Sequence, residues 1–285
     1  MEMPDLYHKS HHEVKRDSGL YLQAYYSKMK WHIDGGENFC EIGAGPGDVS
    51  FNYVFPSIPA NYGKIVFSDI SKDMLDFFKS NYKLPSKCEF KVMDIAAKQG
   101  VPTELEGLFD HVISMLVMHW VSDTRMALKN MLSLLRPQGG DCFMTFFSFN
   151  NIFAANYHMA KVDQKWSPFI KNEECFVSSF HFSQDPQAEF TEMMMEAGYS
   201  HISVSVKPVA YHYGDRYQFI ENIRPVCGIL SYIPKSMQSE FMEDYIDVMA
   251  KLGAQHRGLK ETDCENMMIA DLIVASGNKL GTISN

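Results

Sequence analysis

A glycine-rich turn directly after a short apolar run constrains the fold of this chain most strongly. Residues 38–43 (NFCEIG) have the length and composition of a buried strand, and they lead into residues 41–47 (EIGAGPG). Glycine permits positive φ angles and the close approach of a ligand to the backbone. A loop of this kind at the carboxyl end of a strand is where open α/β sheets bind nucleotides.

Strand-like and helix-like segments alternate after this turn. We expect strands at 64–69, 88–93, 110–116 and 141–149, and helices at 71–81 and 122–135. Nearly all-apolar strands joined by crossovers of this length are typical of a parallel sheet covered on both faces. The expected fold class is therefore α/β.

The other segments follow less regular patterns. Residues 5–29 are expected to be helical with a break near Ser18 and Gly19, and 150–182 contain no clean strand. Later elements are helices at 185–197, 214–222 and 235–252 and strands at 201–207 and 268–275. We expect a single domain over 1–285, with a core from about 36–149, 185–208 and 266–276 and a cap from 1–30, 150–184 and 214–262.

Three acidic side chains occur at the ends of predicted strands. The third glycine comes too early for a G-x-G-x-x-G dinucleotide fingerprint, and Glu41 would repel a phosphate. The cationic amino-acid end of S-adenosylmethionine suits Glu41. Asp69 can accept hydrogen bonds from the ribose hydroxyls. Asp94 can accept a hydrogen bond from the adenine amino group, with Ile95 packed on the adenine ring. Taken singly, the loop is consistent with a tight turn, Asp69 with a helix cap and Asp94 with a solvated loop residue.

Composition excludes several other classes. The net charge of −9 disfavours nucleic-acid binding, which uses clustered Lys and Arg. No apolar stretch approaches the ~20 residues of a membrane span, and residues 1–17 lack the pattern of a signal peptide. The six cysteines form no C-x-x-C pair, which disfavours a zinc site and indicates reduced thiols in the cytoplasm. The 19 Met and 20 Phe are consistent with a Met-rich core or a large apolar pocket.

The ordered segments EIGAGPG (41–47), FSDIS (67–71), VMDI (92–95) and FDHVIS (109–114) resemble the class I S-adenosylmethionine-dependent methyltransferases. A narrower set is similar to the insect juvenile hormone acid methyltransferases: KW (30–31), NYG (61–63), HW (119–120), GGDC (139–142) and EDYIDV (243–248). This similarity runs from about Leu6 to Ala275. It implies a Rossmann-like sheet, mostly parallel with the last strand antiparallel, and a helical cap.

The resemblance also implies an activity and a set of site residues. Such enzymes methylate the carboxylate of juvenile hormone acid or farnesoic acid. The candidate cofactor contacts are Glu41, Gly43, Ala44, Gly45, Asp69, Ile70, Met74, Asp94, Ile95 and Ser114. Trp120 and His119 are the candidate catalytic residues beside the substrate carboxylate. A family glutamine that also faces this carboxylate corresponds to Val14, which cannot donate a hydrogen bond.

Methyl transfer to a carboxylate needs no general base, because the acid is already ionised at neutral pH. Alignment of the two reactants and exclusion of water are then the main tasks of the protein. The expected partner is a small apolar carboxylic acid, and a homodimer is left open. The alternatives are a methyltransferase for another small acid, a cofactor- or terpenoid-binding protein with little activity, and a nicotinamide-dependent oxidoreductase.

Overall fold

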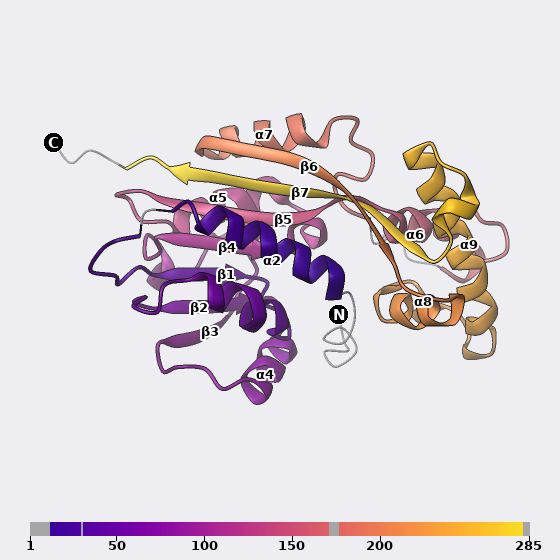
Figure 1. Ribbon diagram of the computed structural model, residues 1–285, viewed down its shortest axis with the longest axis horizontal. Helices are drawn as coiled ribbons and strands as arrows, with labels where there is room; N and C mark the ends of the chain where they lie inside the picture. Colours follow the sequence, from indigo (N-terminus) through magenta and orange to yellow (C-terminus); the bar gives the residue numbers. More distant parts are fainter. Residues whose placement is uncertain (1–11, 30, 171–176, 282–285) are drawn as a thin grey trace. The chain divides into compact units, whose positions relative to one another are not determined.

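The computed structural model describes residues 12–29, 31–170 and 177–281, in which seven strands form one sheet (Figure 1). The spatial order is β3-β2-β1-β4-β5-β7-β6. β1 pairs in parallel with β2 and β4, β2 with β3, and β4 with β5, whereas β7 is antiparallel. The strands are β1 (Phe39–Ile42), β2 (Ile65–Asp69), β3 (Cys88–Val92), β4 (His111–Met115), β5 (Gly140–Asn150), β6 (Ser200–His212) and β7 (Met267–Lys279). The α/β fold class and the expected strands are confirmed.

Helices connect and cover these strands. They are α2 (His12–Tyr26), α3 (Phe55–Ser57), α4 (Lys72–Asn81), α5 (Thr124–Leu134), α6 (Asn151–Lys161), α7 (Pro186–Ala197), α8 (Arg216–Ile223) and α9 (Gln238–Arg257). Two short turns are used below, the π-helical η1 (Ser50–Val54) and the 3₁₀-helical η3 (Met118–Trp120). Within the described ranges, every helix is too short or too polar to cross a bilayer.

The chain divides into two compact units. Unit 1 comprises Met1–Phe146, Asp185–Val206 and Ile273–Asn285, and unit 2 comprises Phe147–Gln184 and Lys207–Leu272. The division falls within β5, β6 and β7. Helix α2 groups with unit 1, although the sequence placed residues 1–30 in the cap. The single-domain organisation stays a prediction.

The predicted break in the first helix is wrong. α2 continues through Ser18 and Gly19, both of which are buried. A Cβ atom at Gly19 would lie 2.4 Å from the ring of Tyr53. This glycine therefore serves close packing between α2 and the segment after the glycine-rich loop, and it does not end the helix.

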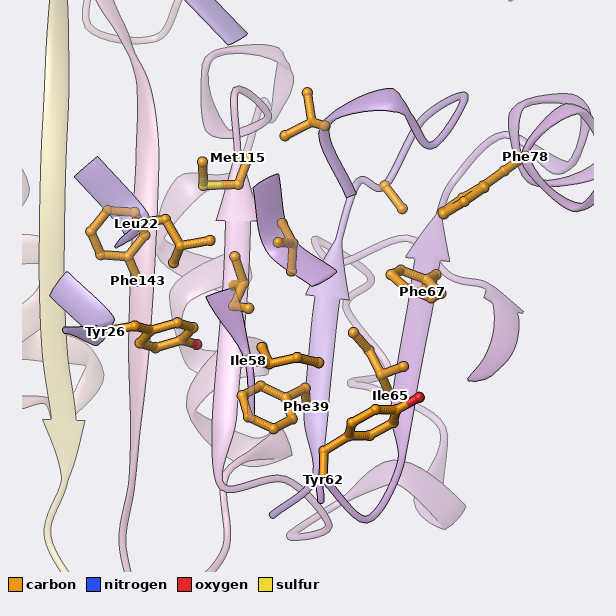
Figure 2. Close-up of a cluster of buried hydrophobic side chains, with 14 residues drawn as sticks. Leu22, Tyr26, Phe39, Ile58, Tyr62, Ile65, Phe67, Phe78, Met115 and Phe143 are labelled. Atoms are coloured by element: carbon orange, nitrogen blue, oxygen red, sulfur yellow. The ribbon is translucent and has the colours of Figure 1, made fainter. Parts of the chain in front are cut away.

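The core of unit 1 lies between α2 and one face of the sheet (Figure 2). Side chains alternate along a strand, so Phe39 of β1 and Phe143 of β5 point to this face. Leu22 and Tyr26 of α2 meet them, and Tyr26 lies 6.3 Å from Phe39 between ring centroids. α2 is thereby fixed to the central strands.

The amino-terminal edge of the same face holds a buried polar group. His111 Nδ1 lies 2.6 Å from Asp141 Oδ2, and the Tyr25 hydroxyl donates to Asp141 Oδ1 at 3.3 Å. Phe39 stacks on the His111 ring at 4.7 Å. These contacts hold the carboxyl end of α2 at the edge of the sheet opposite the glycine-rich loop.

Unit 2 contains a helix that the sequence did not predict. α6 begins at Asn151, and the Asn150 side chain caps it by accepting from the Ile152 amide at 2.8 Å. The buried Tyr245 hydroxyl of α9 lies 2.7 Å from Asn156 Oδ1. Asn151 accepts from the Ile269 amide of β7 at 3.0 Å. Buried polar groups of this kind fix the mutual positions of α6, α9 and β7 because each has a partner.

Candidate functional site

Glu41 is the most unusual side chain at the carboxyl end of β1. It is 1% exposed, and its Oε2 atom is buried without a hydrogen-bond partner. Burial raises the pKa of its carboxyl to about 8; the Ser50 hydroxyl opposes this rise, and the nearby carboxylates of Asp48 and Asp69 add to it. By strand alternation it points to the face that α2 covers, as Phe39 does. Its unpartnered Oε2 atom is available to a cationic ligand group, which would favour the ionised carboxylate.

The loop after Glu41 leaves room for a ligand. Gly45 has a φ of +56°, and a Cβ atom built there would meet nothing within 4 Å. Its amide donates to Asp69 Oδ2 at 2.9 Å, while the Ser71 amide donates to Asp69 Oδ1 at 2.8 Å. The Asp69 carboxylate therefore shapes the loop as well as the start of α4. Burial raises its pKa, and these amide donors oppose the rise.

The end of β3 lies next to Asp69, since the Met93 amide donates to the Asp69 carbonyl at 2.9 Å. Asp94 is exposed, and its Oδ1 accepts from the Ala96 amide at 2.9 Å. Ile95 is 5% exposed, and its carbonyl accepts from the Asn130 side chain at 2.7 Å. The sequence analysis missed Asn130, which ties this turn to α5.

Three further predicted cofactor residues differ widely in exposure. Ile70, directly after β2, is 69% exposed, whereas Met74 of α4 is buried. Ser114 of β4 is fully buried, pairs in register with Ile42, and has an unpartnered hydroxyl. Ser114 thus adds a second free polar atom at the carboxyl edge of the central strands.

The backbone is strained just after β4. Leu116 has a φ of +60°, a conformation that branched apolar residues rarely adopt, and its amide donates to the Thr145 carbonyl at 2.6 Å. Such outliers cluster at functional sites. This one redirects the chain into η3, which carries His119 and Trp120.

His119 and Trp120 lie side by side in η3, with ring centroids 5.1 Å apart. His119 is buried, and burial lowers its pKa to about 3, so the imidazole is neutral at physiological pH. Trp120 is 40% exposed. A neutral imidazole and a half-exposed indole can orient a carboxylate, but they supply no net positive charge.

The first helix brings a residue that the sequence analysis missed. Val14 is buried, and its neighbour Lys15 is only 2% exposed. Lys15 Nζ lies 2.9 Å from Asp48 Oδ2, directly after the glycine-rich loop. A signal existed in the sequence, because Lys15 is on the 3–4-residue stripe that Ser18, Leu22 and Tyr26 continue.

The EDYIDV segment (243–248) is not part of this group and belongs to unit 2. Arg216 of α8 bonds to Glu243 and Asp247, the latter at 2.8 Å. Asp244 accepts from the buried Trp166 indole at 2.8 Å. In the structure this segment ties α9 to its neighbours within unit 2.

The structure brings Glu41, the loop glycines, Asp69, Asp94 and Ser114 to the carboxyl edge of β1 to β4. An orphaned buried carboxyl, open space above Gly45 and acidic strand ends fit a cationic nucleotide. They fit the phosphates of a dinucleotide poorly, because like charges repel.

Comparisons with known proteins also indicate a methyltransferase. A family described as "Methyltransferase domain" matches residues 39–139. The juvenile hormone acid O-methyltransferase of Drosophila melanogaster is 30% identical over 279 residues, covering 98% of this chain and 93% of that protein. The protein of the same name from Bombyx mori is 31% identical over 252 residues, covering 88% and 87%.

Solved structures agree on the fold. A putative methyltransferase from Bacillus halodurans superposes with a TM-score of 0.59, covers 93% of this chain and 99% of its own, and is 14% identical. At 14% sequence identity, this similarity shows the fold alone.

Proposed function

Because the chain belongs to the juvenile hormone acid O-methyltransferase family, we propose that it methylates the carboxylate of a sesquiterpenoid acid, either juvenile hormone acid or farnesoic acid. The observation that carries the proposal is sequence similarity to the Drosophila melanogaster enzyme over nearly the whole chain. The methyl donor is S-adenosylmethionine, and the acceptor class comes from the names of the two insect relatives.

The proposed cofactor residues combine the chemistry of the site with what the family resemblance implies. Glu41 would accept a hydrogen bond from the cofactor's ammonium group. Asp69 would accept hydrogen bonds from its ribose hydroxyls, and Asp94 would accept one from its adenine amino group. Gly43, Ala44 and Gly45 would give backbone contact, while Ile70, Met74, Ile95 and Ser114 would complete the surroundings of the nucleotide. When bound, the cofactor supplies an electrophilic methyl group on a sulfonium.

On the substrate side, the Trp120 indole N–H would donate to the substrate carboxylate, and neutral His119 offers a second donor. Two uncharged donors would orient the attacking carboxylate oxygen. They would bind it less strongly than a bidentate arginine salt bridge, so the oxygen would keep its nucleophilicity. A terpenoid acid of ordinary pKa, ~4–5, is already ionised, so no residue has to remove a proton. The protein contributes alignment and exclusion of water.

Val14 motivates a second candidate. A buried valine offers no donor at the position that corresponds to the family glutamine. The chain could then be a low-activity protein that binds the cofactor and a terpenoid, or a methyltransferase for a different small acid.

One experiment separates these functions. The purified chain is incubated with methyl-labelled cofactor and with farnesoic acid, juvenile hormone acid and short fatty acids in parallel. Methyl esters of the terpenoid acids alone support the proposal. Preference for a short acid supports a methyltransferase for a different small acid. Cofactor binding without formation of any ester supports a low-activity binding protein.

The proposal extends to the setting of the enzyme. We expect a cytoplasmic location, which agrees with the five free thiols among the described cysteines. An apolar acid is the expected partner, with no nucleic acid. A homodimer would be tested by the mass of the protein in solution.

A further inference from the structure

Lys15 stands apart from the other cations of the described chain. It is the one Lys or Arg within residues 12–29, 31–170 and 177–281 that is buried. Its ammonium lies 2.9 Å from Asp48 Oδ2, and burial lowers its pKa although Asp48 opposes this. Burying a charged pair costs more than most surface pairs contribute, so the location calls for a reason.

The contact between α2 and η1 contains further buried polar atoms. The Ser18 hydroxyl of α2 lies one turn after Lys15, and the Ser50 hydroxyl of η1 lies two residues after Asp48. Both serines are fully buried. The Ser18 hydroxyl has no hydrogen-bond partner, whereas the Ser50 hydroxyl lies close enough to the Glu41 carboxyl to lower its pKa. Buried hydroxyls without partners are uncommon, because each loses its bonds to water.

All of these groups lie near Glu41. Asp48 is close enough to raise the pKa of the Glu41 carboxyl, and Glu41 points to the sheet face that α2 covers. The region therefore holds one buried ammonium, one hydroxyl without a partner and one carboxyl with an unpartnered oxygen. The ion pair between Lys15 and Asp48 does not explain the unpartnered Ser18 hydroxyl or the Glu41 Oε2 atom.

This set matches the amino-acid end of the cofactor, where an ammonium and a carboxylate share one carbon atom. We propose that Lys15, with the Ser18 hydroxyl, binds the α-carboxylate of S-adenosylmethionine while Glu41 accepts a hydrogen bond from its ammonium. The inference rests on the proposed function, since it names residues for the cofactor of that reaction. Lys15 then bridges Asp48 and the cofactor carboxylate, and α2 becomes part of the cofactor site.

A ligand that lacks the carboxylate provides the test. Affinities of the full chain for S-adenosylhomocysteine and for decarboxylated S-adenosylmethionine are measured by calorimetry. The variants are Lys15→Met together with Asp48→Asn, which leaves no unpaired buried carboxylate, Lys15→Arg, and Ser18→Ala. Lys64→Met serves as the matched control, because Lys64 forms an exposed ion pair with Glu89 at 2.9 Å.

We expect the double variant to bind S-adenosylhomocysteine about 10- to 100-fold more weakly, as the loss of a charged hydrogen bond predicts. Its affinity for the decarboxylated ligand should change by less than about 3-fold. Lys15→Arg should restore most of the loss, Ser18→Ala should show a smaller loss with the same selectivity, and the control should leave both affinities unchanged.

Equal weakening of both ligands would overturn the proposal, since it would mean that the ion pair only holds the loop in shape. Unchanged affinity for both ligands would overturn it as well. If the double variant does not fold, the ligand selectivity of Ser18→Ala decides. Failure of the proposed function looks different, because the unmodified chain would then bind neither ligand or would bind both and form no terpenoid ester.

Discussion

Replacement of Glu41 by glutamine should change how the stability of the cofactor-free chain depends on pH. In the folded chain this carboxyl keeps its proton up to about pH 8, whereas in the unfolded chain it loses it near the ordinary 4.5. The folded pKa is raised, so the unfolded chain binds fewer protons between these values and stability falls as pH rises. From pH 5 to pH 8.5 the contribution of Glu41 should worsen by about 4 kcal/mol.

The measurement is the free energy of unfolding by urea at pH 5 and at pH 8.5. Glu41→Gln has no proton to lose, so its stability relative to the unmodified chain should rise by most of that amount at the higher pH. Glu104→Gln is the control, because Glu104 is exposed in its ion pair with Lys91. Parallel pH curves for the unmodified chain and Glu41→Gln would refute the reasoning.

The same carboxyl links cofactor binding to protons. At pH 7 about one in ten empty sites has an ionised Glu41, and a bound ammonium would require the ionised form. Affinity for S-adenosylhomocysteine should therefore rise about 25-fold from pH 6.5 to pH 8.5, with proton release detectable in buffers of different ionisation enthalpy. A flat profile would show that Glu41 does not ionise on binding.

The remaining predictions concern the substrate side and unit 2. Trp120→Phe keeps an aromatic ring but removes the N–H, so methyl transfer should fall by about 10-fold or more while S-adenosylhomocysteine affinity stays unchanged; equal losses in a product assay and in calorimetry would exclude a substrate role. Val14→Gln restores an amide donor and should raise turnover of terpenoid acids, and unchanged turnover of every acid would show that this position does not meet the carboxylate. Tyr245→Phe removes the buried hydrogen bond from the Tyr245 hydroxyl to Asn156 Oδ1 and should cost about 1–3 kcal/mol in urea unfolding, with cofactor affinity retained.

The sheet could be predicted from the sequence because its strands are nearly continuous apolar runs bounded by turn residues. β1, β2 and β4 are of this kind, and the glycine-rich loop fixed which end of the sheet would carry the ligand. The acidic strand ends at Glu41, Asp69 and Asp94 then follow from the parallel order. Side-chain alternation and strand order together suffice for this part of the site.

Long-range packing explains what sequence patterns missed. Gly19 looked like a helix break because its contact partner, Tyr53, is 34 positions further along the chain. α6 lacks an amphipathic stripe, since its buried face includes polar residues such as Asn151 and Asn156 that bond to α9 and β7. Lys15 was assigned no role because lysine is normally exposed, and only the fold reveals Asp48 beside it.

The close contact of Gly19 with Tyr53 reverses a common rule of protein engineering. Exchange of an interior helical glycine for alanine usually stabilises a helix by up to about 1 kcal/mol. In α2 the added methyl group would collide with an aromatic ring 2.4 Å away, so either the Tyr53 ring or the helix would have to shift. A thermostabilisation programme that ranks substitutions by helix propensity alone would therefore select, at this position, a change that loosens the attachment of α2 beside the methyl-donor site.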